Sequence, residues 1–195
     1  MISHVTRFID LNNKNFLVVP IIQEDELLSS WLVRVALAHD TIPWSFYNMH
    51  FPEYKNIIFS RDLDVWAPQK FLEKLAQKSN LPYQEIFNLT LQSYIGTLLP
   101  QFNPSGMNKY FSYIKVRGRS NKLYGQKYCP KCLQENTLPY FKKEWRLKYI
   151  KTCKKHSLVL QEKCPNCNKP ISIYKFSKQG YGYTKCWNCY SLLYK

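Results

Sequence analysis

The sequence lacks long apolar runs and has only six glycines, and both shortages exclude classes of protein. No apolar stretch approaches the roughly 18 residues that a membrane-spanning helix needs. The N-terminal sequence MISHVTRFIDLNNKNFLVV has a polar residue every few positions and no small-residue cleavage site, so it does not resemble a secretory signal. No P-loop, GxSxG motif or Gly-rich nucleotide loop occurs. We therefore expect a cytoplasmic protein, and no catalytic motif stands out.

Acidic residues are scarce in only one half of the chain. Residues 1–100 hold eight Lys/Arg and ten Asp/Glu, a net charge of −2, whereas residues 101–195 hold twenty and three, a net charge of +17. A metal-dependent nuclease or transposase needs clustered carboxylates, and Asp62 and Asp64 are the closely paired acids outside a helix start. A local cap or salt bridge explains this pair better than Mg²⁺ does. The sequence thus predicts no enzyme, but a basic half that suits a polyanion such as nucleic acid.

The basic half offers cations for phosphate contact and aromatic rings for base stacking. Phosphate contacts carry affinity but little sequence information, whereas stacked rings hold unpaired bases. We expect nucleic-acid contacts at Lys115, Arg117, Arg119, Lys122, Lys142, Lys143, Arg146, Lys148, Lys154 and Lys155. Base stacking and packing inside the fold are alternatives for Tyr113, Tyr124, Tyr181 and Tyr183.

All seven cysteines and one histidine fall into two sets with the spacing of zinc ligands. The first set is Cys129, Cys132, Cys153 and His156, and the second is Cys164, Cys167, Cys186 and Cys189. A two-residue spacer lets a tight turn aim two ligand atoms at one ion, and a second turn completes a tetrahedron. Four protein ligands leave no position for a reacting water, so we expect two structural Zn²⁺ ions. The alternative, redox-active CxxC pairs, needs neither a CxxH nor a second pair at a matching distance.

Helical periodicity dominates the N-terminal half. Apolar residues recur at helical spacing over residues 24–39, 43–49, 68–79 and 83–94, and residues 16–19 suit a short strand. The acids Glu24, Asp25 and Glu26 are expected in a first helical turn, at the positive end of the helix dipole. The predicted fold is a mainly α N-terminal helix-turn-helix domain followed by a small α+β region of two tandem zinc fingers or ribbons. The expected segments are a helical domain (1–100), a basic linker (101–127) and two zinc fingers (128–163 and 164–195).

Residues 72–91 have the pattern of a helix-turn-helix. Ala76 is the small residue that lets the second helix cross closely, and Asn80 tolerates the positive φ that the turn needs. The second helix would then present Tyr83, Gln84, Glu85 and Asn88 outward. An ordinary helical hairpin uses the same pattern, and this outward face is not basic. The segment therefore suits protein contacts as well as it suits DNA.

Several segments, in order and over nearly the whole chain, resemble the TniQ/TnsD family of transposon target-selection proteins. Those before the cysteines are residues 25–34 (DELLSSWLVR), 61–64 (RDLD) with Pro68, and 89–94 (LTLQSY). Later ones are residues 128–132 (YCPKC) and 139–147 (PYFKKEWRL), which lead into the remaining zinc ligands. Each piece is short, but the ordered set together with the ligands is specific to the family.

The resemblance implies a non-catalytic adaptor in DNA transposition. Relatives recognise a DNA site, or a CRISPR effector with its guide RNA, and pass that choice to an AAA+ ATPase of the TnsC/TniC type, which recruits the transposase. This chain ends six residues after Cys189, so a further C-terminal DNA-binding domain is not expected, as in the short, CRISPR-associated members. The alternative function is a stand-alone zinc-ribbon or helix-turn-helix transcription regulator that binds duplex DNA directly.

Overall fold

The computed structural model describes residues 7–8, 15–58, 61–98, 109–112, 114, 125–175 and 182–194, which are mainly helical with little strand. The helices are α1 (Leu28–Ala38), α2 (Pro43–His50), α3 (Lys55–Ile58), α4 (Gln69–Ser79), α5 (Tyr83–Asn88) and α6 (Pro130–Glu135). Short 3₁₀ turns are η1 (Pro52–Tyr54), η2 (Leu91–Tyr94), η3 (Glu144–Arg146), η4 (Ile173–Lys175) and η6 (Gly182–Thr184). Strand β1 (Arg7–Phe8) pairs antiparallel with β2 (Val18–Val19), which lies within the strand expected at residues 16–19.

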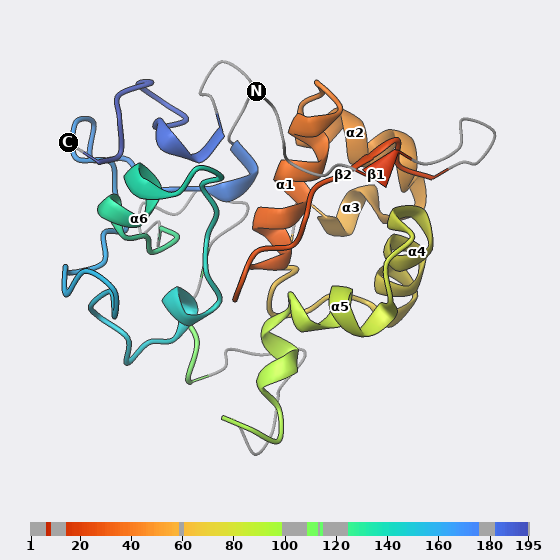
Figure 1. Ribbon diagram of the computed structural model, residues 1–195, viewed down its shortest axis with the longest axis horizontal. Coiled ribbons are helices and arrows are strands. Elements are labelled where there is room, and N and C mark those ends of the chain that lie inside the picture. Colours follow the sequence, from red (N-terminus) through yellow and green to blue (C-terminus); the bar gives the residue numbers. More distant parts are fainter. Residues whose placement is uncertain are drawn as a thin grey trace.

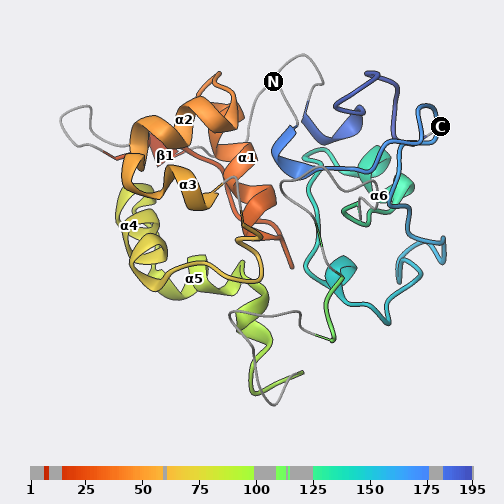
Figure 2. The ribbon, with the colours of Figure 1, turned by 180° about the vertical axis from the view of Figure 1, so that it is seen from behind.

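The helices and the cysteine-rich segments form two halves that lie side by side. Figures 1 and 2 show α1 to α5 gathered on one side and α6 with the later segments on the other, with α1 facing the boundary. One apolar cluster packs around Trp31 and Phe71, and a second packs around Trp145. Leu27 and Leu91 of the helical half belong to the second cluster, so the halves share buried surface. The segment boundaries expected from the sequence stay predictions, and most of the expected linker lies outside the described residues.

Helix α1 begins later than its sequence pattern predicts. Its apolar face is buried as expected, but the helix starts at Leu28 rather than at residue 24. The reason is that Asp25 has a positive φ of 56°, and the backbone around it pairs with a distant segment instead of continuing the helix. The acids therefore do not occupy the first turn, and Glu26 is instead buried against Arg34, with 2.6 Å between Oε2 and Nη1.

The turn between α4 and α5 has the conformation that the sequence predicts. Asn80 adopts φ 51° and ψ 40°, and the Leu81 amide donates to the Ala76 carbonyl at 3.1 Å, which closes the end of α4. The residues expected to face outward from α5 are exposed: Tyr83, Gln84, Glu85 and Asn88. The hairpin geometry is thus present, while a DNA-reading role for it stays a prediction.

Helix α5 is shorter than expected, because it ends at Asn88 and a separate 3₁₀ turn follows from Leu91. The buried Thr90 is extended, and its hydroxyl donates to the Phe87 carbonyl at 2.7 Å. The Leu91 amide donates to the Asp64 carbonyl at 2.8 Å. These two bonds replace the helical ones, so the helix predicted over residues 83–94 is broken by a contact that helical spacing does not reveal.

Candidate metal centres and the contact between the two halves

The first ligand set converges on one point. Three sulfurs and the Nδ1 atom of the histidine lie within 4.8 Å of one another, from Cys129, Cys132, Cys153 and His156. Cys129 Sγ and Cys132 Sγ each lie 3.4 Å from His156 Nδ1, and Cys132 Sγ lies 3.6 Å from Cys153 Sγ. A tetrahedron with Zn–S of about 2.3 Å and Zn–N of about 2.0 Å has edges of about 3.5 to 3.8 Å. The spacing therefore fits one zinc ion and excludes a disulfide, whose sulfurs are roughly 2 Å apart.

The second set has the same geometry with four sulfurs, from Cys164, Cys167, Cys186 and Cys189. Cys164 Sγ lies 3.6 Å from Cys189 Sγ, and Cys167 Sγ lies 3.7 Å from Cys186 Sγ. These distances again match the edges of a tetrahedral zinc–sulfur site. The two groups could thus hold two zinc ions, in the pairing that the sequence predicts.

Three of the four ligand pairs lie on turns with the same backbone conformation. The residue after the second ligand has a positive φ in each: Ser157 (54°), Asn168 (54°) and Tyr190 (59°). Its amide donates to the carbonyl of the first cysteine at 2.7 to 3.0 Å, and an antiparallel bridge flanks the turn. All three residues therefore adopt the left-handed conformation, which Asn tolerates better than most residue types. Such turns aim both ligand atoms inward and need few core residues around them.

The remaining pair is built on a helix. Pro130 occupies the first helical position of α6, where a missing amide hydrogen costs nothing, so Cys129 precedes the helix and Cys132 lies in its first turn. The Leu133 amide donates to the Cys129 carbonyl at 3.2 Å, and Leu133 itself is buried. The pair is thereby fixed to the core of its half.

A carboxylate supports the histidine ligand. The Nε2 atom of His156 lies 2.9 Å from Glu135 Oε2, so Nε2–H donates to the carboxylate and leaves Nδ1 free to bind metal. Lys155 Nζ lies 2.9 Å from the same oxygen, and these two hydrogen bonds lower the pKa of Glu135 to about 2. Glu135 lies three residues after Cys132, one helical turn away on α6. This spacing is the feature of the sequence from which the role of Glu135 could be predicted.

The buried thiols require a cation to ionise. Burial raises the pKa of Cys132 far above its ordinary value and raises that of Cys186 to about 12. Cys189 is the opposite case, because the Ser191 amide donates to it and lowers its pKa to about 6. A bound Zn²⁺ supplies the charge that turns such thiols into thiolates at neutral pH. The donor chemistry therefore fits zinc as well as the distances do.

Residues 139–147, here named the strap, connect the first centre to the helical half. The strap lies in the chain between the two ligand pairs of that centre, and its Lys142 forms an antiparallel β-bridge with Glu26. The Leu27 amide donates to the Phe141 carbonyl at 2.9 Å, and the Lys143 amide donates to the Asp25 carbonyl at 2.7 Å. The Phe141 amide donates to Ser30 Oγ at 3.0 Å. The start of α1 is thus held by the cysteine-rich half.

Arg146 of the strap makes a buried ion-pair cluster with two acids of the helical half. Its Nη1 lies 3.1 Å from Asp64 Oδ2, and its Nη2 pairs with Asp62. Asp64 also accepts from the Ser29 amide at 2.8 Å and from its hydroxyl at 2.7 Å. These acids do form a salt bridge, but it is not the local one that was expected, because the partner is distant in sequence. Arg146 is fully buried, so the prediction that it contacts phosphate is wrong.

Lys143, like Arg146, is a cation of the strap whose side chain makes its contacts within the protein. Its Nζ donates to the Asn88 carbonyl at 2.5 Å and to Ser93 Oγ at 3.2 Å, and it lies over the Tyr94 ring. It therefore stabilises the C-terminal end of α5, where a cation is favoured. With only 9% of its surface exposed, Lys143 also does not match the predicted phosphate contact.

The structure describes only some of the other residues that are predicted to contact nucleic acid. Lys148, Lys154 and Lys155 are exposed and Lys142 is half-buried, so their side chains remain candidates. Lys154 Nζ lies 3.5 Å from Glu144, and in this pair the lysine is exposed while the glutamate is half-buried. The rest lie outside the described residues: Lys115, Arg117, Arg119 and Lys122.

Tyr183 is buried, so the base-stacking alternative does not hold for it. Its ring packs edge-on against Phe141 with centroids 4.6 Å apart, and its hydroxyl donates to the Ser30 carbonyl at 2.8 Å. It joins the second ligand set to α1, a role that nothing in the sequence signals. Trp145 is buried beside Phe141. Tyr113, Tyr124 and Tyr181 lie outside the described residues.

Comparison with known proteins assigns most of the chain to one family. No described helix is long and apolar enough to cross a membrane. A search of curated proteins found no match. The family model TniQ matches residues 17–160, a span that covers the helical half, the strap and the complete first ligand set. Since this match extends over well more than half of the 195 residues, the chain belongs to the TniQ family.

Proposed function

We propose that this protein is a non-catalytic, zinc-binding adaptor that links target recognition to an AAA+ ATPase of the TnsC/TniC type, which recruits the transposase. Membership of the TniQ family implies the adaptor role in transposition. The target is a DNA site or a CRISPR effector with its guide RNA. The observation that carries the proposal is the strap, which unites the family-matched helical half and the first metal centre in one scaffold.

Zinc has a structural role in this proposal. Each centre offers four protein ligand atoms at tetrahedral spacing, so both ions would be enclosed by the chain. When bound, they supply folding free energy to segments with little regular secondary structure. Metal analysis of the purified protein should give two zinc ions per chain, and a value well below two would contradict the assignment.

The basic half is the proposed nucleic-acid surface. Lys148 and Lys154 are exposed, and exposed lysines add affinity that falls as salt rises. Changing both to Glu should weaken binding to DNA or RNA and flatten its dependence on salt. The matched control changes two exposed lysines of α4, Lys70 and Lys74, and should leave binding nearly intact. A third variant, with Arg117, Arg119 and Lys122 changed to Glu, tests the remaining candidates.

The adaptor role is tested with the partner itself. Mixing the protein with its cognate AAA+ ATPase on DNA should give a stable complex in sedimentation or electron microscopy. Absence of association by either method would count against the role. Tight, sequence-specific duplex binding by the protein alone, at physiological salt, would instead favour a stand-alone regulator. Helix α5 has six residues and an exposed Glu85, so it offers that alternative little support.

A further inference from the structure

The chain makes a tight turn where the strap ends, over residues 147–150, here named the Tyr149 turn. The Ile150 amide donates to the Leu147 carbonyl at 3.2 Å, which closes the turn and places Lys148 and Tyr149 at its tip. Tyr149 is 58% exposed. Within the part of the chain that the structure describes, its hydroxyl has no hydrogen-bond partner and its ring packs on no other ring. The ring is therefore available to a ligand.

A buried lysine fixes the backbone of the Tyr149 turn from inside the protein. Lys127 Nζ donates to the Leu147 carbonyl at 3.2 Å and to the Ile150 carbonyl at 3.1 Å, so it bridges both ends of the turn. The Lys148 amide donates to the Tyr110 carbonyl at 2.8 Å. Because the backbone is already fixed, little conformational freedom is lost when a ligand packs against the exposed ring.

Two lysines flank Tyr149 with charges that no acid compensates. Lys148 directly precedes the tyrosine and Lys151 follows it by two positions, and both are exposed. Among the described residues, neither ammonium group has an ion-pair or hydrogen-bond partner. Residues 147–160 include no acid. The Tyr149 turn thus combines an exposed aromatic ring with two cations that are free to bind an anion.

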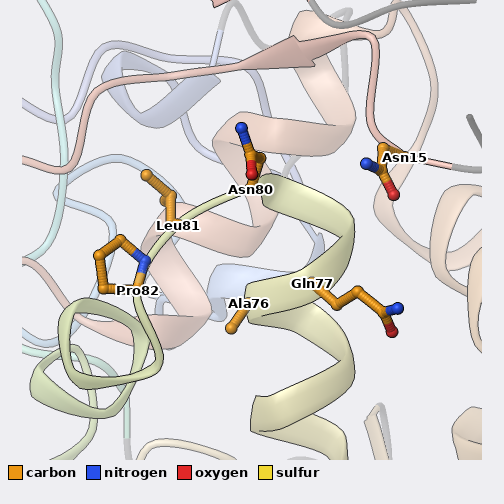
Figure 3. Close-up of a pocket in the computed structure, with 6 residues that line it drawn as sticks. All are labelled: Asn15, Ala76, Gln77, Asn80, Leu81 and Pro82. Carbon is orange, nitrogen blue, oxygen red and sulfur yellow. The ribbon is translucent and has the colours of Figure 1, made fainter.

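The hollow at the end of α4 lacks both of these features. It has a volume of about 530 Å³ and is lined by Asn15, Ala76, Gln77, Asn80, Leu81 and Pro82 (Figure 3). None of these residues carries a charge or an aromatic ring. Tyr83, the next residue along the chain, is 36% exposed, and the acid Glu85 follows it two positions later. Tyr83 is therefore an exposed tyrosine in surroundings that do not suit a polyanion.

We infer that the Tyr149 turn binds an unpaired nucleotide strand, with one base stacked on the Tyr149 ring and flanking phosphates on Lys148 and Lys151. An aromatic ring stacks on any unpaired base, and the lysines add affinity without reading sequence. A duplex fits less well, because a base must first leave the helical stack. The inference rests on the proposed nucleic-acid surface and specifies its ligand, which is a single strand of DNA or RNA.

The test compares single strands with a duplex, using the full-length, zinc-loaded protein and fluorescence anisotropy. The probes are a twenty-nucleotide oligothymidylate, an oligouridylate of the same length, and the duplex of oligothymidylate with oligodeoxyadenylate. Tyr149→Ser should weaken single-strand binding about 5- to 100-fold, which is the effect of losing one base–aromatic stack, and should leave duplex binding nearly unchanged. Tyr149→Phe keeps the ring and should bind like wild type, as should the matched control Tyr83→Ser. The tighter of the two single strands identifies DNA or RNA as the source.

The two lysines are tested through the salt dependence of binding. Each phosphate contact with a single strand contributes about 0.7 to the slope of log affinity against log salt concentration. Changing both Lys148 and Lys151 to Met should therefore reduce the magnitude of this slope by about 1.4 for oligothymidylate. The matched control changes Lys70 and Lys74 of α4 to Met and should leave the slope unchanged.

Single-strand binding by Tyr149→Ser as tight as that of wild type would overturn the inference. If the variant with Lys148 and Lys154 changed to Glu still bound more weakly, the broader basic surface would stand. An equal loss of single-strand and duplex binding in Tyr149→Ser would also overturn it, since the ring would then not select unpaired bases. Unchanged binding to every probe, together with loss of the complex with the ATPase, would overturn it in favour of a protein contact at Tyr149.

Discussion

Arg146 Nη1 lies 3.1 Å from Asp64 Oδ2, and this contact joins residues 82 positions apart in the chain. Both side chains are buried, and Asp64 in addition accepts two hydrogen bonds from Ser29 at the start of α1. Its carbonyl accepts from Leu91, where α5 has ended. Asp64 is therefore the point where α1, the end of the helical hairpin and the cysteine-rich half meet.

Removing the arginine should strongly destabilise the protein. Arg146→Met leaves Asp62 and Asp64 without their cation, and loss of one partner of a buried pair costs about 3–5 kcal/mol. Equilibrium unfolding of the zinc-loaded protein in guanidinium chloride measures the loss. The second change Asp64→Asn, made in the Arg146→Met protein, should restore part of it by removing the uncompensated charge.

The control for Arg146 is an ion pair on the surface. Lys74 pairs with Glu53, and both side chains are well exposed. Lys74→Met should therefore barely move the unfolding midpoint. If Arg146→Met were as mild as this control, the cluster would not hold the two halves together.

Loss of the first metal centre should loosen the strap more than loss of the second. Cys132→Ser and Cys167→Ser should each reduce the zinc content from two ions to one. The strap lies between the ligand pairs of the first centre, so Cys132→Ser should expose the amides of Leu27 and Lys143 to hydrogen exchange. Mass spectrometry of deuterium uptake measures both variants, and equal uptake at these amides would contradict the prediction.

Glu135 should tune the first centre without being a ligand. Glu135→Gln removes the carboxylate that accepts from His156 Nε2, and loss of such a partner typically lowers metal affinity about 10- to 100-fold. Competition with a chromophoric chelator measures the affinity of each centre. The second centre is the internal control, and Glu85→Gln on α5 is the matched surface variant. An unchanged first affinity would mean that the ring is oriented without this carboxylate.

The ligand sets could be predicted from the sequence because metal chemistry constrains spacing locally. A turn with two intervening residues fixes the positions of both ligand atoms. The first set, from Cys129 to His156, also spans a stretch of chain similar in length to the second set, so the grouping of the ligands is nearly unambiguous. Helices α2 and α4 could also be predicted from the sequence, because apolar residues that recur every 3.6 positions indicate a helix with one buried face. The positive φ of Asn80 was predictable because few residue types tolerate that conformation.

The contacts between the halves could not be predicted, because they depend on residues far apart in the chain. Helical spacing gave no reason for α1 to begin at Leu28, or for α5 to end before Leu91. Both boundaries result from backbone bonds to the strap and to Asp64. Arg146 is misread for the same reason, since a basic residue in a basic segment resembles a surface contact until its buried partners are known.

Acid should destabilise the fold through His50, the last residue of α2. Burial, helped by the charges of Lys78 and His39, lowers the pKa of His50 to about 4, against 6.5 in an unfolded chain. At pH values between about 4 and 6.5, His50 is mostly protonated in the unfolded chain and mostly neutral in the folded one. The stability contribution of neutral His50 is therefore complete above pH 6.5 and is lost as the pH falls from about 6.5 through about 4.

The measurement compares wild type with His50→Gln at pH 7 and pH 5. Both proteins have the same metal-ligand residues, so the difference between their free energies of unfolding isolates His50, and wild type should lose more stability on acidification. Lys78→Met removes the nearest cation and should raise the pKa of His50 in an NMR titration. A wild-type His50 that titrated near 6.5 would contradict the burial that the packing of Phe16 and Phe46 around its ring indicates.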